Sequence, residues 1–160
     1  FNRLAPNALV YSKRIIETGE KVKLMVQETN SGFGGAVLQA AEAIGDADFL
    51  LMLGDHLYRS DSHESCVQQM ISHFNGNPTV SLRWSSEDDI EHCGTMTGRW
   101  DSKSGHLHVT EIAEKPSREV ARRSLLAPAP PSVVGPQMGE YLTVFGLYIL
   151  TPAIFRILER

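Results

Sequence analysis

Three short segments of this chain carry side chains that can do chemistry. The first is an apolar run from Phe49 to Leu53 that ends in Gly54 and the carboxylate Asp55. An apolar run bounded by turn signals predicts a strand buried on both faces. Asp55 is then at or just past the carboxyl end of that strand, where ligands bind in open α/β sheets. A carboxylate in that place can hold a hard cation such as Mg2+ against a phosphate.

The second segment is polar and rich in glycine, and it follows an expected strand that ends at Gln27. Gly32, Gly34 and Gly35 allow a ligand to approach the backbone closely, and the helix expected after them points its first N–H groups into the same space. Gln27 has both a donor and an acceptor, which suits the edge of a nucleobase. A plain strand-to-helix turn also explains these glycines, because the segment matches neither the Rossmann nor the P-loop fingerprint.

The third segment is Glu114-Lys115-Pro116 at the end of an expected strand. Lys115 can neutralise a phosphate as a point charge, and Glu114 can accept hydrogen bonds from sugar hydroxyls. Pro116 favours extended geometry at the residue before it, which fixes the direction of the Lys115 side chain. A surface ion pair beside a turn explains the same residues. Gly94, at the start of another expected strand, marks either the close approach of a ligand or a bulge.

Two histidines near Asp55 suggest an alternative metal chemistry. His56, Asp61 and His63 follow it closely, but a zinc site needs three ligands in a fixed geometry. Asp61 is also a suitable residue to open the next helix. We therefore favour a Mg2+ site at Asp55 over zinc hydrolysis.

The elements that must position these residues alternate along the first half of the chain. We expect helix 8–18, strand 22–27, helix 36–44, strand 49–53, helix 63–74 and strand 79–84. This alternation favours a mostly parallel sheet covered by helices. For the second half we expect an antiparallel pair of strands at 94–100 and 106–113, a loop at 126–139, a strand at 141–150 and a helix opened by Pro152.

Composition narrows the class of protein. The 160 residues, 42% of them hydrophobic, fit one globular domain. The net charge of -4 argues against a nucleic-acid partner, and the apolar runs are too short to span a bilayer. Cys66 and Cys93 form no CxxC pair, so we expect reduced thiols in a cytoplasmic protein. A homo-oligomer is compatible with all of these properties.

Taken in order, the motifs resemble those of sugar-1-phosphate nucleotidylyltransferases, and the resemblance covers nearly the whole chain. The segment from Gln27 to Ala40 is similar to their base-binding loop and helix, and Ile44 to Asp55 is similar to their metal-binding strand. Glu114-Lys115-Pro116 matches their EKP motif, and Thr143 to Leu150 matches the strand after it. The glycine-x-glycine loop and the later Pro/Gly segment look most like the bacterial-type UTP–glucose-1-phosphate uridylyltransferases.

The resemblance implies a Rossmann-like α/β sandwich of the glycosyltransferase-A type, with a mixed, mostly parallel sheet. It implies that UTP and glucose-1-phosphate react with the help of Mg2+ to give UDP-glucose and pyrophosphate. The catalytic positions are Asp55 and Lys115, with Asp55 as the metal ligand and Lys115 on the sugar phosphate. The implied substrate-binding residues are Gln27 and Gly32 for uracil, Gly94 and Glu114 for glucose, and Gly146 near the sugar pocket.

The sequence departs from the family pattern in four places. It contains neither the family's G-x-G-T-R-like loop, which cradles the triphosphate, nor the second metal-binding aspartate. Gly35 stands where a histidine is common, and no tyrosine precedes Gly94. We therefore expect residues 1–160 to be part of a single nucleotidyltransferase domain, truncated at both ends and inactive alone. Open alternatives are a thymidylyl- or guanylyltransferase for another hexose-1-phosphate, a non-catalytic nucleotide-sugar-binding domain, and a Mg2+-dependent phosphohydrolase that uses Asp55.

Overall fold

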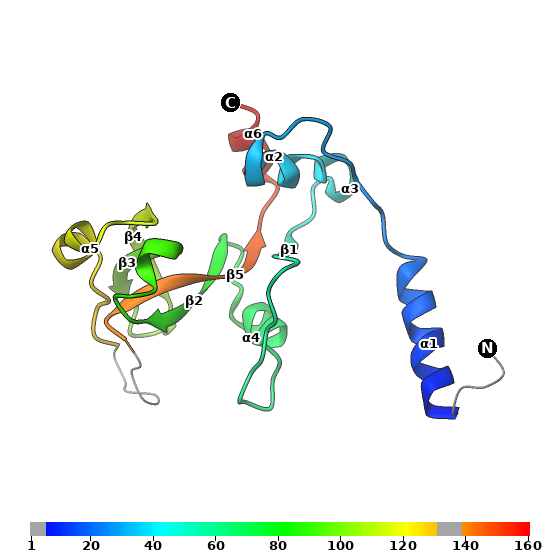
Figure 1. Cartoon of the computed structure of the whole chain (residues 1–160), viewed down its shortest axis with the longest axis horizontal. Coiled ribbons are helices and arrows are strands. Elements are labelled where there is room, and N and C mark those ends of the chain that lie inside the picture. Colours follow the sequence, from blue (N-terminus) through cyan, green and yellow to red (C-terminus); the bar gives the residue numbers. More distant parts are fainter. Residues whose placement is uncertain (1–5, 131–138) are drawn as a thin grey trace. The chain divides into compact units, whose positions relative to one another are not determined.

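The computed structural model describes residues 6–130 and 139–160 of the chain (Figure 1). The chain divides into two compact units, one formed by Phe1–Gly45 with Phe155–Arg160 and the other by Asp46–Ile154. Most of the loop expected at 126–139 falls on residues 131–138, which lie outside the described residues. None of the helices in the described part of the chain is long and apolar enough to cross a membrane.

The first unit is helical. It contains α1 (Pro6–Gly19), α2 (Gly32–Leu38), α3 (Ala41–Ile44) and most of α6 (Ala153–Leu158). Helix α1 confirms the helix expected at 8–18. The strand expected at 22–27 is wrong, because no strand in the described residues pairs with this segment, and Leu24 is 87% exposed. An isolated extended segment gains no ladder hydrogen bonds.

The glycine-rich segment also differs from the expectation. Gly32, Gly34 and Gly35 lie inside α2, which begins four residues before the helix expected at 36–44. That expected helix is divided into α2 and α3 by a turn at Gln39 and Ala40. The glycines are therefore part of a short helix.

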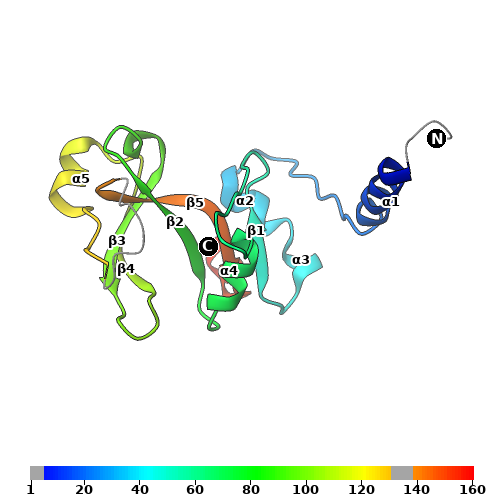
Figure 2. The ribbon, with the colours of Figure 1, turned by 90° about the horizontal axis from the view of Figure 1, so that it is seen from below.

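The second unit is built on one sheet of five strands. The strands are β1 (Phe49–Met52), β2 (Thr79–Ser85), β3 (Gly94–Trp100), β4 (Leu107–Glu114) and β5 (Tyr141–Leu150). Their order is β1-β5-β3-β4, with β2 also paired to β5. Figure 2 shows β5 running the length of this unit, with β2 alongside it.

Every strand pairing in the described residues is antiparallel, so the expectation of a mostly parallel sheet is wrong. The physical reason lies in β5. Strands β1 and β2 point in the same direction, as the alternation of helices and strands predicts, but both pair with β5, β1 with residues 147–150 and β2 with residues between 141 and 149. Because β5 runs antiparallel between them, the two parallel strands never form a ladder. The antiparallel β3–β4 hairpin confirms the pair expected at 94–100 and 106–113.

Two further elements differ from the expectations for this unit. Strand β1 is half-buried, with Met52 46% exposed, so the expectation of a strand buried on both faces is wrong. Helix α4 (Cys66–His73) begins later than expected, since Ser65 and Gln68 form its capping box and Asp61 does not cap it.

The sheet packs against two small helices, each with its own apolar cluster. Met70 of α4 packs with Leu147 and Ile149 of β5. At the other end of β5, Tyr141 packs with Ala121 of α5 (Arg118–Ser124) and with Ile90 of the short 3-10 helix η1 (Ile90–His92). Helix α5 has no counterpart in the expected elements, although Ser117 as its N-cap and the basic residues of its last turn are recognisable helix signals.

Candidate functional site

Asp55 lies in a turn three residues past the end of β1, as the sequence predicts. Its side chain is 86% exposed, and one carboxylate oxygen is 2.9 Å from Nδ1 of His56. The hydrogen bond from His56, followed by one from the backbone, lowers the pKa of Asp55 below its ordinary value. The carboxylate is therefore ionised and open to solvent, as a ligand for a hard cation must be.

The turn that carries Asp55 is fixed to β5 at Gly146. The backbone N–H of Leu53 donates to the Gly146 carbonyl at 3.2 Å, and the Tyr58 hydroxyl donates to the same oxygen at 2.6 Å. Gly146 has φ +77, and a Cβ there would lie 2.9 Å from Leu53 Cδ1. A glycine is needed at this point because the backbone is left-handed and the neighbours leave no room. Gly146 thus holds the Asp55 turn in place.

Gly94 and Glu114 face each other as partners at the ends of β3 and β4. A Cβ at Gly94 would lie 3.0 Å from Oε2 of Glu114 and 3.2 Å from Cγ2 of Val144. The absence of a side chain at position 94 therefore leaves the space that the Glu114 carboxylate occupies. The unbroken register excludes a bulge at Gly94, and the group that approaches its backbone closely is the Glu114 carboxylate.

Lys115 follows directly and has an unusual backbone. Its φ is 47, in the left-handed region, so the extended geometry expected before Pro116 is wrong. The Lys115 N–H donates to the carbonyl of Cys93 at 3.3 Å, one step beyond the Gly94–Glu114 pair. A left-handed lysine costs about 1–2 kcal/mol, and such strain concentrates at functional sites. Its side chain is exposed.

Tyr148 of β5 is a residue that the sequence reasoning missed. Burial raises its pKa most, and the negative charges of Glu114 and of Tyr58, when ionised, raise it further. The pKa of Tyr148 therefore depends on Glu114, at the end of β4, and on Tyr58, which fixes the Asp55 turn. The sequence alone gives no signal of this, because strands are rich in aromatic residues for packing reasons too.

In the first unit, Gln27 and Gly32 form a local structure of their own. The Gln27 side-chain amide donates to Ser31 Oγ at 2.9 Å and to the Gly32 carbonyl at 3.1 Å. Gly32 has φ +78, and a Cβ at Gly35 would collide with both Ser31 and Gln27. The amide N–H groups of Gln27 are used inside the loop, so the group it offers to a ligand is its Oε1 acceptor.

The donor set fits a Mg2+ ion better than zinc. In the described residues no group of three or more His, Cys, Asp or Glu side chains is placed to hold a metal ion. Asp61 pairs with Arg59, and His63 is exposed. Mg2+ keeps several of its waters and commonly binds through one or two carboxylates together with substrate phosphates, which is compatible with Asp55 alone.

A pocket of about 640 Å³ lies elsewhere in the second unit. It is bounded by the start of β2, by Trp84 and Trp100, and by the β3–β4 turn around His106. None of the predicted site residues lines it. Asp55, Glu114 and Lys115 instead lie exposed at strand ends and turns.

The comparisons with known proteins point to one family. The family model described as nucleotidyl transferase matches residues 5–160. The UTP–glucose-1-phosphate uridylyltransferase of Streptococcus pneumoniae serotype 4 is 26% identical over 147 residues, which are 89% of this chain and 44% of that protein.

The chain is also similar to solved structures. A crystal structure of UDP-glucose pyrophosphorylase complexed with UDP-glucose has a TM-score of 0.74 and 28% identity, over 98% of this chain and 54% of that one. For UTP-bound UGPase from Acinetobacter baumannii the TM-score is 0.61 and the identity 21%, over 96% of this chain and 52% of that one, which shows likeness of fold. The chain thus spans about half the length of these relatives.

Proposed function

The chain belongs to the nucleotidyl transferase family, and from this premise we propose that its complete gene product transfers a uridylyl group from UTP to glucose-1-phosphate. The products are UDP-glucose and pyrophosphate. The observation that carries this proposal is the strained Lys115, held beside Glu114 and Gly94 at the ends of β3 and β4. A cation on an exposed turn next to a carboxylate suits a sugar phosphate.

The chemistry requires no general base. A phosphate oxygen of glucose-1-phosphate, already ionised at neutral pH, attacks the α-phosphorus of UTP. A new oxygen–phosphorus bond forms as the bond to the β-phosphate breaks, and pyrophosphate leaves. The protein contributes position and charge neutralisation. In this proposal the Lys115 ammonium binds the sugar phosphate, and Glu114 accepts hydrogen bonds from the hexose hydroxyls.

Asp55 is the proposed ligand of Mg2+, which when bound neutralises charge on the nucleotide phosphates. Its exposure and its lowered pKa support this role. Gln27 is the proposed base-reading residue, with Oε1 accepting from the N3–H of uracil. Gly32 gives the base access to the backbone beside it, and Gly146 keeps the Asp55 turn near the sugar. In the complete protein we propose pyrophosphate and UDP-glucose as products released to solution, with no nucleic-acid or membrane partner.

The decisive experiment measures UDP-glucose formation by the complete gene product from UTP and glucose-1-phosphate in the presence of Mg2+. We expect activity that is lost in the Asp55→Asn variant and unchanged in Asp61→Asn, which is the matched control. Replacing UTP with dTTP or GTP tests the alternative transferases. Phosphate release from sugar phosphates without nucleotide, lost in Asp55→Asn, would instead support a phosphohydrolase, and binding of UDP-glucose without turnover would support a non-catalytic domain.

A further inference from the structure

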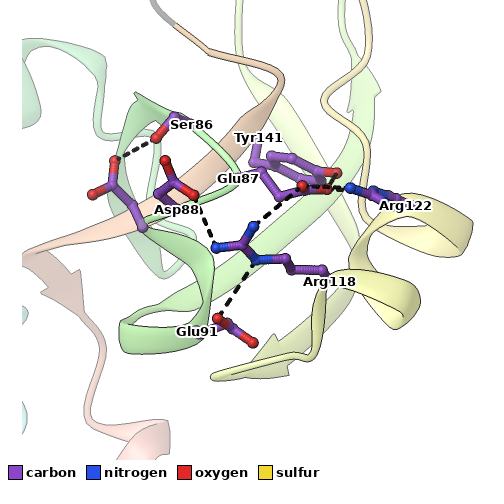
Figure 3. Close-up of polar contacts among 8 residues, drawn as sticks. Ser86, Glu87, Asp88, Glu91, Arg118, Arg122 and Tyr141 are labelled. Carbon is purple, nitrogen blue, oxygen red and sulfur yellow. Dashed lines mark hydrogen bonds and ion pairs between the residues drawn. The ribbon is translucent and has the colours of Figure 1, made fainter.

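Five charged residues form an ion-pair network between α5 and residues 87–91, which we call the clamp. Figure 3 shows Arg118 and Arg122 of α5 turned toward Glu87, Asp88 and Glu91. Arg122 binds both carboxylate oxygens of Glu87 through Nε and Nη2. Arg118 binds Asp88 at 2.8 Å and lies 3.6 Å from Glu91 and 3.9 Å from Glu87. A bidentate arginine pair within a network is the kind of surface ion pair that contributes to stability.

The clamp lies over a fully buried apolar cluster. Ile90, Ala121, Leu125 and Tyr141 are all 0% exposed. The Tyr141 hydroxyl reaches up from this cluster to within 3.4 Å of Glu87 Oε1. Glu87 is the centre of the clamp because its one carboxylate meets Arg122, Arg118 and Tyr141. The clamp and the apolar cluster beneath it together hold η1 against α5.

The same two chain segments lead directly into the proposed sugar-phosphate site. Residues 87–91 are followed by Cys93 and Gly94, and α5 is preceded by Glu114, Lys115 and the buried Pro116. Lys115 N–H bonds to the Cys93 carbonyl, so the segments are joined on the site side as well. Ser117 lies in the chain between Lys115 and the clamp residues of α5, and its hydroxyl caps α5 by accepting from the Val120 N–H. The Lys115 turn is thus held on one side by the β3–β4 ladder and on the other by the clamp.

A strained residue keeps its conformation only where the surrounding structure determines it. We propose that the clamp, with Glu87 as its central residue, positions Lys115 and Glu114 for the sugar phosphate. The inference rests on the proposed function, since it takes Lys115 and Glu114 as the groups that bind glucose-1-phosphate. Glu87 is a positioning residue, because it acts through α5 and touches no substrate. When the clamp is broken, α5 is free to shift and the Lys115 turn relaxes toward unstrained geometry.

The first test is kinetic and uses the complete gene product. In Glu87→Gln we expect the KM for glucose-1-phosphate to rise about fivefold or more, while the KM for UTP changes less than twofold. Arg118→Gln is the second variant, and its surface position makes it the safer one for folding. The matched control is Arg123→Gln, on the same helix, because Arg123 has no ion pair in the described residues. Equal changes in both KM values, or none, would overturn the proposal.

The second test needs no activity. Hydrogen exchange of the Lys115 amide reports its bond to Cys93, and we expect exchange about tenfold faster in Glu87→Gln than in Arg123→Gln, with exchange at Met70 of α4 unchanged. If the wild-type protein makes no UDP-glucose, the proposed function fails while this measurement still tests whether the clamp holds the turn. Unchanged exchange at Lys115, or faster exchange with an unchanged KM for glucose-1-phosphate in an active enzyme, would refute positioning by the clamp.

Discussion

The hydroxyl of Tyr58 donates a 2.6 Å hydrogen bond to the carbonyl oxygen of Gly146, a residue 88 positions later in the chain. The same hydroxyl accepts from the Leu53 N–H at 3.3 Å, and its ring meets Phe145 edge-on with centroids 5.4 Å apart. Tyr58 therefore closes the turn that contains Asp55 against the middle of β5. Asp55, although exposed, is carried on a turn fixed at both ends.

We expect Tyr58→Phe to loosen this turn while keeping the aromatic packing. The variant loses the hydrogen bond to the Gly146 carbonyl and the longer one from the Leu53 N–H, which keeps the Gly146 carbonyl as an acceptor. The free energy of unfolding should therefore fall by about 1–2 kcal/mol. The Mg2+ concentration needed for half-maximal activity of the complete gene product should rise, because the proposed ligand Asp55 is held less firmly. Thermal unfolding and Mg2+ titration measure the two effects. Tyr11→Phe is the control, since Tyr11 is 70% exposed on α1; an equal effect there would contradict the argument.

A second prediction concerns the space at Gly94. Gly94→Ala places a methyl group 3.0 Å from Glu114 Oε2 and 3.2 Å from Val144 Cγ2, and overpacking of this kind costs about 1–3 kcal/mol. We expect Glu114 to move and the affinity for glucose-1-phosphate, measured by calorimetry, to fall more than that for UTP. Gly19→Ala is the control because a Cβ there meets nothing within 4 Å. Unchanged sugar-phosphate affinity would show that Glu114 does not bind the sugar.

The strain at Lys115 allows stability and binding to be separated. Lys115→Gly removes the cost of a left-handed side chain, about 1–2 kcal/mol, and adds the conformational entropy of glycine, about 0.5–1 kcal/mol. Stability in denaturant should therefore stay the same or rise slightly, while glucose-1-phosphate binding is lost. Lys115→Ala should lose binding without the gain in stability. A strong loss of stability in Lys115→Gly would mean that the side chain is held for structural reasons.

The clamp should give stability a specific dependence on pH. The hydrogen bond from Arg122 lowers the pKa of Glu87 below its ordinary value of 4.5. The folded state therefore favours the ionised form, so this contribution is fully present above about pH 5 and is lost as pH falls through the lowered pKa. The difference in Tm between wild type and Glu87→Gln should be constant near neutral pH and shrink below pH 4.5. The control is Glu111→Gln, because Glu111 has no ion pair in the described part of the chain. A difference for Glu87→Gln that grows toward acid pH would contradict the prediction.

Sequence patterns predicted the parts of this fold that depend on local signals. The β3–β4 hairpin, α1 and the place of Asp55 past β1 follow from periodicity and turn residues. The antiparallel pairing of the sheet does not follow from these signals. It depends on β5, which lies far along the chain from β1 and β2 and pairs with both of them. Long-range pairing of this kind leaves no mark on the local alternation of helix and strand.

Sequence patterns propose the residues of the candidate site by type, but they do not predict the backbone that carries these residues. The proline rule predicts an extended Lys115, yet the β3–β4 register and the capped helix α5 impose a φ of 47. The link between Tyr58 and Gly146 joins residues with no common motif. The roles of Glu87, Arg118 and Arg122 depend on α5. The N-cap Ser117 and the basic residues of the last turn indicate this helix in the sequence, but the sequence analysis does not predict it.

The last prediction concerns which group of Gln27 reads the base. Both amide hydrogens are directed into the loop, toward Ser31 Oγ and the Gly32 carbonyl. Gln27→Glu replaces the donor nitrogen with an oxygen that faces the Gly32 carbonyl, so the loop should lose its geometry. The affinity for UDP-glucose should then fall at least about tenfold, which corresponds to about 1.4 kcal/mol. Gln39→Glu makes the same charge change on an exposed side chain that bonds Gly35 weakly at 3.4 Å, and should bind normally. Uracil and thymine both present an N3–H to the remaining Oε1 acceptor. The ratio of the affinities for UDP-glucose and dTDP-glucose, measured by calorimetry on the complete gene product, should therefore be the same in Gln27→Glu as in wild type although both affinities fall. A changed ratio would show that Gln27 senses the position where the two bases differ.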